Sequence, residues 1–207
     1  MSQSILRCAV ALGLPMLLLG GCARTEPARF YLLRPVAEAD VGQTTKGVHP
    51  IGDEMAIAIE AVELSAYLDR PEIATRRGLY QVQFADFDRW AEPLADNIAQ
   101  VLADNLSVLL RSEHIYVFPL AVNTQVDYRL TVDIARFDNE PGEGALLRVH
   151  WMLRDRDERR MLISRKVEYR EPLREQDYES IAAGNSRLLA RLSRDIAEAV
   201  RGLPGLE

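Results

Sequence analysis

The stretch QVDYRLTVDI, residues 125–134, decides the fold, because apolar and polar side chains alternate through it one by one. The apolar set is Val126, Tyr128, Leu130, Val132 and Ile134. A period of two residues places these side chains on one face of a β-strand and the polar set on the other. A strand with one buried and one solvated face is typical of antiparallel sheets. The stretch therefore predicts a half-buried, antiparallel strand.

Two hairpins are expected on either side of this strand. Residues 147–154 and 161–169 form one of them across the polar turn 155–158. Residues 72–76 and 79–84 form the other around Arg77-Gly78, and its second strand should present Tyr80, Val82 and Phe84 on one face. These patterns favour a sheet built largely from antiparallel pairs.

Shorter apolar runs predict further strands, separated by irregular segments. Residues 29–33 and 114–118 read as short strands, and 55–62, rich in Ala and Ile, as a strand buried on both faces. Glycines and prolines recur without a period over residues 35–53, which indicates a long surface loop. The other irregular segments are an interrupted connection over 64–71 and a hairpin turn at Pro141-Gly142-Glu143-Gly144.

Two helices are expected in addition. The first should be capped by Asp86 or Asp88, tolerate Pro93 in its first turn, and begin its apolar stripe at Trp90. The stripe consists of Trp90, Leu94, Ile98, Val101, Leu102, Leu106 and Leu109. We expect Trp90 in the core, with a partner contact as the alternative. The second helix should run from about Asp177 to Arg201 and end at Gly202 and Pro204.

Strands, a helix, more strands and a second helix predict an α+β fold in one domain over residues 29–207. A mixed, mostly antiparallel sheet that packs against two main helices would bury the apolar stripe of each helix. Neither an internal repeat nor a second transmembrane segment is visible in the sequence.

The N-terminus predicts export and lipidation. Arg7 precedes an apolar run over residues 8–19 that is too short to span a bilayer, and the run closes on Leu19-Gly20-Gly21-Cys22. This ending resembles a lipobox, in which residues 1–21 are a cleaved signal and Cys22 becomes the lipidated first residue. The alternative is an ordinary signal with an incidental cysteine. Residues 22–28 would form the tether, and its six residues after Cys22 reach about 20 Å when extended.

Position 23 is Ala, where an Asp is the usual mark for retention in the inner membrane of such lipoproteins. We therefore expect the outer membrane, on its periplasmic face. Cys8 would leave with the signal and Cys22 would carry lipid, so the domain has no disulfide. Loss of Arg7 takes the formal net charge from −6 to −7, which disfavours nucleic acid as a partner.

Catalytic signatures are missing from the sequence. No phosphate-binding loop, His-Glu-x-x-His, dinucleotide fingerprint or Gly-x-Ser-x-Gly is present. His49, His114 and His150 are scattered, and the acidic residues fall where solvated carboxylates are the usual outcome. The sequence thus indicates a protein that is not an enzyme and needs neither metal nor cofactor beyond the lipid on Cys22.

Four segments resemble the PqiC-type family, the ABC-type transport auxiliary lipoproteins. They are Phe30–Leu33 close after the lipobox, then YLDRPEIATR over 67–76, FDRWAEPL over 87–94 and VLADNL over 101–106. The resemblance implies a non-enzymatic outer-membrane lipoprotein that docks a PqiB-type MCE (mammalian cell entry) protein, a hollow oligomer thought to conduct lipid between membranes, and so supports membrane integrity. A ring of several copies would match such a partner.

The runner-up hypothesis is a periplasmic lipoprotein that binds or senses a lipid or small ligand in a pocket between sheet and helices. For partner docking we single out Tyr67 and Arg70, because tyrosine and arginine are frequent in interface hot spots and Pro71 fixes the backbone beside them. The alternative is a structural segment in which Leu68 fills the core and Asp69 and Arg70 pair with each other or cap a turn.

Overall fold

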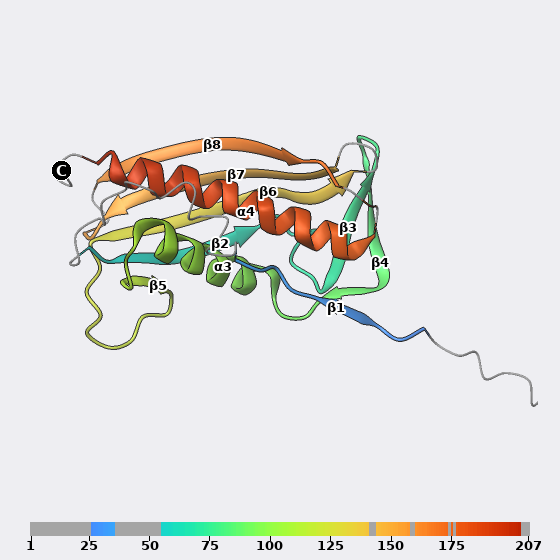
Figure 1. Cartoon of the computed structure of the whole chain (residues 1–207), viewed down its shortest axis with the longest axis horizontal. Helices are drawn as coiled ribbons and strands as arrows, with labels where there is room; N and C mark the ends of the chain where they lie inside the picture. Colours follow the sequence, from blue (N-terminus) through green and yellow to red (C-terminus); the bar gives the residue numbers. More distant parts are fainter. Residues whose placement is uncertain are drawn as a thin grey trace, which may run out of the picture.

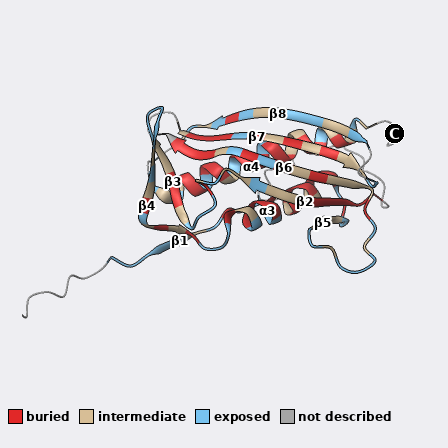
Figure 2. Cartoon of the chain, turned by 180° about the vertical axis from the view of Figure 1, so that it is seen from behind, coloured by how far each residue is buried: buried red, intermediate tan, exposed pale blue. Residues whose placement is uncertain are grey.

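The computed structural model describes residues 26–35, 55–140, 144–157, 160–173, 175 and 177–203. The fold is an eight-stranded sheet with both helices on one face (Figure 1). Figure 2 shows the molecule from the opposite side. The helices are α3 (Leu94–Leu110) and α4 (Tyr178–Arg201). The strands are β1 (Arg29–Tyr31), β2 (Ile57–Leu64), β3 (Glu72–Arg77), β4 (Gln81–Trp90), β5 (Ile115–Val117), β6 (Tyr128–Glu140), β7 (Gly144–Asp155) and β8 (Met161–Glu171). The predicted α+β class is confirmed.

The central strand of the sheet is β6, the strand predicted from the 125–134 alternation. One edge of β6 pairs with β7, and β7 pairs with β8, both antiparallel. Along its other edge β6 pairs first with β2 and then, at Asn139, with β3, both parallel. The expectation of an antiparallel strand therefore holds on one edge only. Alternation with a period of two residues indicates that one face of a strand is buried. It does not specify whether each neighbouring strand is parallel or antiparallel.

The remaining pairings complete a mixed sheet in the order β1-β4-β3-β6-β2-β5. The predicted 72–84 hairpin is confirmed as the antiparallel pair β3–β4, while β1–β4 and β2–β5 are short parallel pairs. Tyr80 does not share the face of Val82 and Phe84, because it lies in the turn and is 95% exposed. In β2, burial on both faces is confined to the first half of the strand.

The core lies between the sheet and the helices. Leu130, Val132 and Ile134 of β6 and Trp151 of β7 have no exposed surface, as the alternation predicts. A register shift between Ile134 and Arg136 interrupts that alternation, and β6 continues to Glu140. Gly144, at φ +94°, starts β7 where a side chain would meet the backbone of Glu171, and it pairs with Glu140 of the antiparallel neighbour β6. The other residues of the predicted hairpin turn, 141–143, lie outside the described residues.

The first helix begins later than predicted. β4 runs on to Trp90, whose backbone N–H donates to the Pro71 carbonyl at 2.7 Å, and Pro93 occupies the N-cap of α3. Proline disfavours helical backbone at the residue before it, so the helix starts after Pro93 and the capping role assigned to Asp86 or Asp88 is wrong. Trp90 is 5% exposed, so its expected burial is confirmed, although it belongs to a strand.

The second helix is confirmed with its ends. The side chain of Asp177 accepts a hydrogen bond from the Ser180 N–H at 2.7 Å, and Gly202 is the C-cap. Among the described residues no helix is both long and apolar enough to cross a membrane. The predicted signal, Cys22, most of the tether and nearly all of the 35–53 loop lie outside the described residues.

Candidate functional site

The strand β1 is where the chain enters the domain from the predicted lipid anchor, and a buried carboxylate fixes it there. Asp88 of β4, 3% exposed, accepts two hydrogen bonds from the Arg29 guanidinium at 2.7 and 2.8 Å and one from the Tyr31 hydroxyl at 2.8 Å. The Arg29 hydrogen bonds hold the pKa of Asp88 below its usual value. Strand β1 is therefore held at a fixed point of the sheet.

The chain stays fixed for several residues after β1. The Leu33 N–H donates to the Asn97 side-chain oxygen at 2.7 Å, and the Arg34 N–H donates to the Ser186 hydroxyl at 3.1 Å. Leu33 is buried, whereas Phe30 in β1 and Leu32 just after it are 65% and 49% exposed. The edge strand and the residue that follows it thus each present an apolar side chain to the outside.

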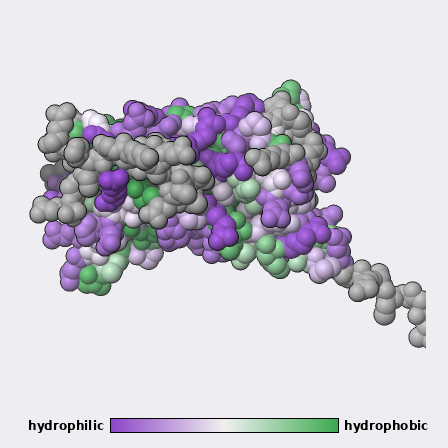
Figure 3. Space-filling view, viewed as in Figure 1, coloured by the Kyte–Doolittle hydropathy of each residue, from purple (hydrophilic) through white to green (hydrophobic). Residues whose placement is uncertain are grey.

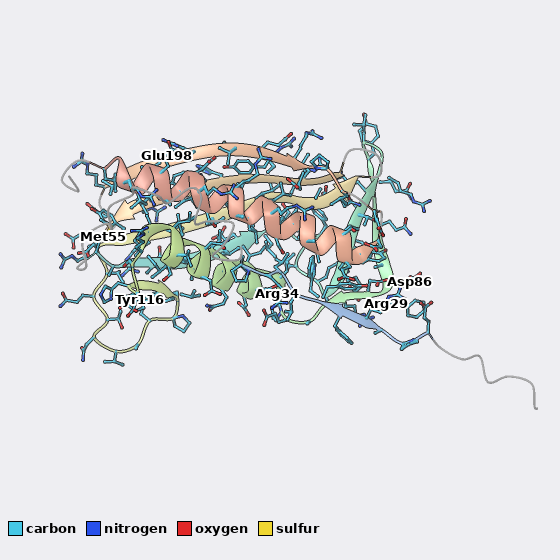
Figure 4. All side chains as sticks on the ribbon, in the orientation of Figure 1. Arg29, Arg34, Met55, Asp86, Tyr116 and Glu198 are labelled. Carbon is cyan, nitrogen blue, oxygen red and sulfur yellow. The ribbon has the colours of Figure 1, made fainter. Side chains whose placement is uncertain are left out.

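A groove of about 890 Å³ lies between β1 and the first half of α4. Small side chains of α4, Ala182, Ala183 and Ser186, leave room for it, while Arg34 and Arg187 add positive charge. Figure 4 places Arg29 at β1 and Arg34 beyond the other end of this strand, and Figure 3 shows apolar surface near β1. The complete lining is Phe30, Tyr31, Leu32, Leu33, Arg34, Pro35, Ala91, Glu179, Ala182, Ala183, Ser186 and Arg187. An apolar floor with cationic and polar groups at the rim suits an amphipathic or extended apolar ligand.

A second buried carboxylate joins the β3–β4 hairpin to β6. Asp138 has no exposed surface and accepts hydrogen bonds from Tyr67 at 2.7 Å, Arg136 at 2.8 Å and Arg76 at 2.9 Å. Burial would raise the pKa of Asp138, but these hydrogen bonds hold it below its usual value. Burial also raises the pKa of Tyr67 to about 12. The cluster therefore ties the β3–β4 hairpin and the segment at Tyr67 to the buried end of β6.

Asp88 and Asp138 contradict the expectation that acidic residues lie on solvent faces. Their partners Arg29 and Tyr67 are 59 and 71 residues away in the sequence, whereas Arg136 is only two residues from Asp138. Local patterns therefore do not reveal the Asp88 cluster and reveal only part of the Asp138 cluster. The local signal for the Asp138 cluster is the break in the β6 alternation after Ile134. Beyond this break β6 continues as a buried strand that contains Asp138.

The two residues singled out for docking occupy different environments. The Tyr67 hydroxyl is bound to Asp138, so this ring is partly buried against the core. Arg70 is exposed, lies 3.7 Å from a Glu72 carboxylate oxygen, and stacks its guanidinium 3.8 Å from the centroid of the Phe84 ring. Leu68 is 3% exposed and fills the core, as expected. The docking role of Tyr67 and Arg70 stays a prediction.

The remaining candidate groups do not form a reactive centre in the described part of the chain. His114 contacts the Tyr116 hydroxyl at 3.1 Å and His150 the Ser164 hydroxyl at 2.9 Å, both at the surface, while His49 lies outside the described residues. Within the described ranges no group of three or more His, Cys, Asp or Glu side chains could hold a metal ion.

Two further apolar surfaces lie at opposite ends of the molecule. Leu79 and Tyr80 form the tip of the β3–β4 hairpin and are 80% and 95% exposed, at the end where β1 leaves the domain (Figures 1 and 3). Phe118 and Val122, in the loop between β5 and β6, are 47% and 91% exposed at the other end. Each end of the described domain therefore presents two exposed apolar side chains.

Comparison with known proteins gives a family and a fold. The model of the ABC-type transport auxiliary lipoprotein component matches residues 31–197. A solved structure of an uncharacterized protein is similar at a TM-score of 0.67 and 18% identity, covering 84% of this chain and 99% of that one. A protein from Xanthomonas campestris is similar at 0.65 and 16% identity, covering 82% and 92%.

A more distant structure, the PelC dodecamer mutant from Paraburkholderia phytofirmans, has a TM-score of 0.46 at 13% identity and covers 72% of this chain and 90% of that one. No curated protein matches the sequence.

Proposed function

Because the chain belongs to the family of ABC-type transport auxiliary lipoproteins, we propose that it is an outer-membrane adaptor of an MCE-type lipid transport system. In this role it is anchored through Cys22 at the periplasmic face, docks a PqiB-type MCE protein and supports membrane integrity without catalysing a reaction. The observation that carries the proposal is the family match over residues 31–197, which covers almost the whole predicted domain.

The entry of the chain into the domain supports an adaptor held close to the membrane. Six residues separate Cys22 from Arg29, where the Asp88 carboxylate fixes β1. The seven residue steps from Cys22 to Arg29 span at most about 25 Å when extended. Strand β1 would thereby be kept within about this distance of the leaflet, so the domain that docks the partner would lie next to the membrane.

The docking surface that we propose includes Arg70, with Tyr67 as a supporting residue. The guanidinium of Arg70 is exposed and held over Phe84, so little side-chain entropy is lost when it binds a partner. Tyr67 contributes mainly by holding the segment to Asp138. A ring of several copies would match an oligomeric MCE tube, and the molar mass of the purified complex tests this arrangement.

A second candidate function is a lipoprotein that binds a lipid or small ligand, and the β1–α4 groove is the observation that favours it. Affinity capture of the lipidated protein from detergent extracts separates the two candidates. An adaptor brings an MCE-domain protein with it. A carrier brings bound lipid without that protein, and this result would overturn the proposal.

A further inference from the structure

We propose that the tip of the β3–β4 hairpin, Leu79 and Tyr80, is a second membrane contact that inserts into the interface of the bilayer carrying the anchor. The inference rests on the proposed function only in taking Cys22 as the anchor. The hairpin tip would be a surface of the folded domain that touches lipid. A lipid anchor on a tether does not by itself require such a surface.

The first observation is that the tether and the hairpin start from the same point. Arg29 pairs with Asp88 both as strand partner and through its side chain. Seven residues lead from Arg29 back to Cys22, and eight lead from Asp88 back to Tyr80. At about 3.3 Å per residue the tether reaches roughly 23 Å, and the β4 arm reaches at most roughly 26 Å, because a register shift opposite Glu72 and Ala74 bends it. Both can therefore meet one membrane surface.

The second observation is their shared place in the molecule. β1 runs parallel to the last residues of β4, and Figures 1 and 2 show the exit of β1 and the hairpin tip at the same end of the long axis. The apolar loop between β5 and β6 lies at the opposite end (Figure 1). Lipidation at Cys22 thus brings the hairpin end toward the bilayer and keeps the other loop away from it.

The third observation is the chemistry of the tip. Residues 77–83 read RGLYQVQ and carry one positive charge and no negative charge, in a mature chain of formal charge −7 derived from −6 by loss of Arg7. Leucine inserts below the headgroups, tyrosine prefers the membrane interface, and arginine pairs with anionic phosphates. Gly78, at φ +74°, holds the turn that presents these side chains outward. The occupant that fits is therefore the lipid–water interface.

The test uses the lipidated full-length protein reconstituted into vesicles of phosphatidylethanolamine and phosphatidylglycerol. Since Cys8 is removed and Cys22 is blocked, one introduced cysteine can be labelled with an environment-sensitive fluorophore. Gln81→Cys reports on the tip while leaving Leu79 and Tyr80 in place, and Ala121→Cys, next to Val122, is the matched control at the far end. Both positions are exposed.

In the vesicles we expect the fluorophore at position 81 to emit at a shorter wavelength and to be quenched by spin-labelled lipid. The fluorophore at position 121 should show the emission of a water-exposed label and should not be quenched. Adding Leu79→Asp and Tyr80→Asp to Gln81→Cys should abolish both effects, and adding Val122→Asp should change neither. These exposed side chains do not support the core, and an unchanged melting temperature checks that the variants fold.

Equal, unquenched emission at positions 81 and 121 in a lipidated, vesicle-bound protein would overturn the inference. So would a tip variant that loses its MCE-domain partner while position 81 is never reached by the lipid quencher, because the tip would then be a protein contact. Different results would contradict the proposed function. These are the absence of a fatty acid on Cys22 or the absence of an MCE-domain protein from the capture experiment, and neither depends on the fluorophore.

Discussion

Replacing Asp138 with Asn should weaken the attachment of the β3–β4 hairpin to β6 and lower the stability of the whole domain. The variant keeps the size of the side chain but leaves Arg76 and Arg136 without their shared counter-charge, and an amide cannot accept all the hydrogen bonds that the carboxylate accepts. Removing one partner of a buried ion pair costs about 3–5 kcal/mol. Since the two arginine side chains keep 17% and 16% of their surface exposed, we expect the lower end, about 3 kcal/mol.

The assay is equilibrium unfolding in urea, with thermal unfolding beside it. For a domain of 150–250 residues 1 kcal/mol corresponds to about 2–4 °C, so the melting temperature should fall by about 6–12 °C. Tyr67→Phe is the matched control, because it removes one hydrogen bond and keeps the charges, and it should cost about 1 kcal/mol.

The pH dependence gives the same experiment a second readout. The pKa of Asp138 is lowered in the folded state, so its contribution is fully present above the unfolded pKa of about 3.9 and disappears as the pH falls through the folded value. The difference between the two proteins should be constant from about pH 5 to 7 and should shrink in strong acid. A variant within about 0.5 kcal/mol of the wild type at pH 7, as for an ordinary surface change, would refute the reasoning.

Three further predictions follow from the core, the anchor and the docking segment. Trp90→Ala should cost roughly 3–5 kcal/mol in urea unfolding by opening a cavity, and an unchanged stability with lost partner binding would make Trp90 an interface residue instead. Cys22→Ser should abolish metabolic labelling with a fatty acid, and persistent labelling would contradict the lipoprotein assignment. Arg70→Ala, alone or with Tyr67→Ala, should reduce co-purification of the MCE-domain partner from folded protein, whereas wild-type recovery would move the docking surface elsewhere.

The parts of the fold that the sequence predicts are those decided by local patterns. The hairpin β7–β8 and the helix α4 follow from a period of two residues and from caps at Asp177 and Gly202, which need no knowledge of distant neighbours. The start of α3 was misplaced because Trp90 has the correct spacing for the helical stripe. Spacing alone does not reveal that the Trp90 backbone binds the Pro71 carbonyl. Pro93 is the local feature that indicates a later helix start.

The candidate site depends on contacts that are distant in the sequence. The groove is lined on one side by β1 and the residues after it, and on the other by α4, whose Ser186 is 152 residues from Arg34. Three small side chains of α4 are part of its lining. Each of these side chains is ordinary in its own segment. The burial of Asp88 and Asp138 also depends on distant partners, since Arg29 and Arg76 lie 59 and 62 residues from the carboxylates that they bind.

The most direct test of the adaptor role is the amount of the MCE-domain protein in the outer-membrane fraction of cells that express either the wild-type chain or Cys22→Ser. If this protein docks the conduit at the outer membrane, the MCE-domain protein is recovered there with the wild-type chain and is lost from that fraction with Cys22→Ser. Equal recovery with both chains would contradict the account, because the outer-membrane contact of the conduit would then be made without this lipoprotein.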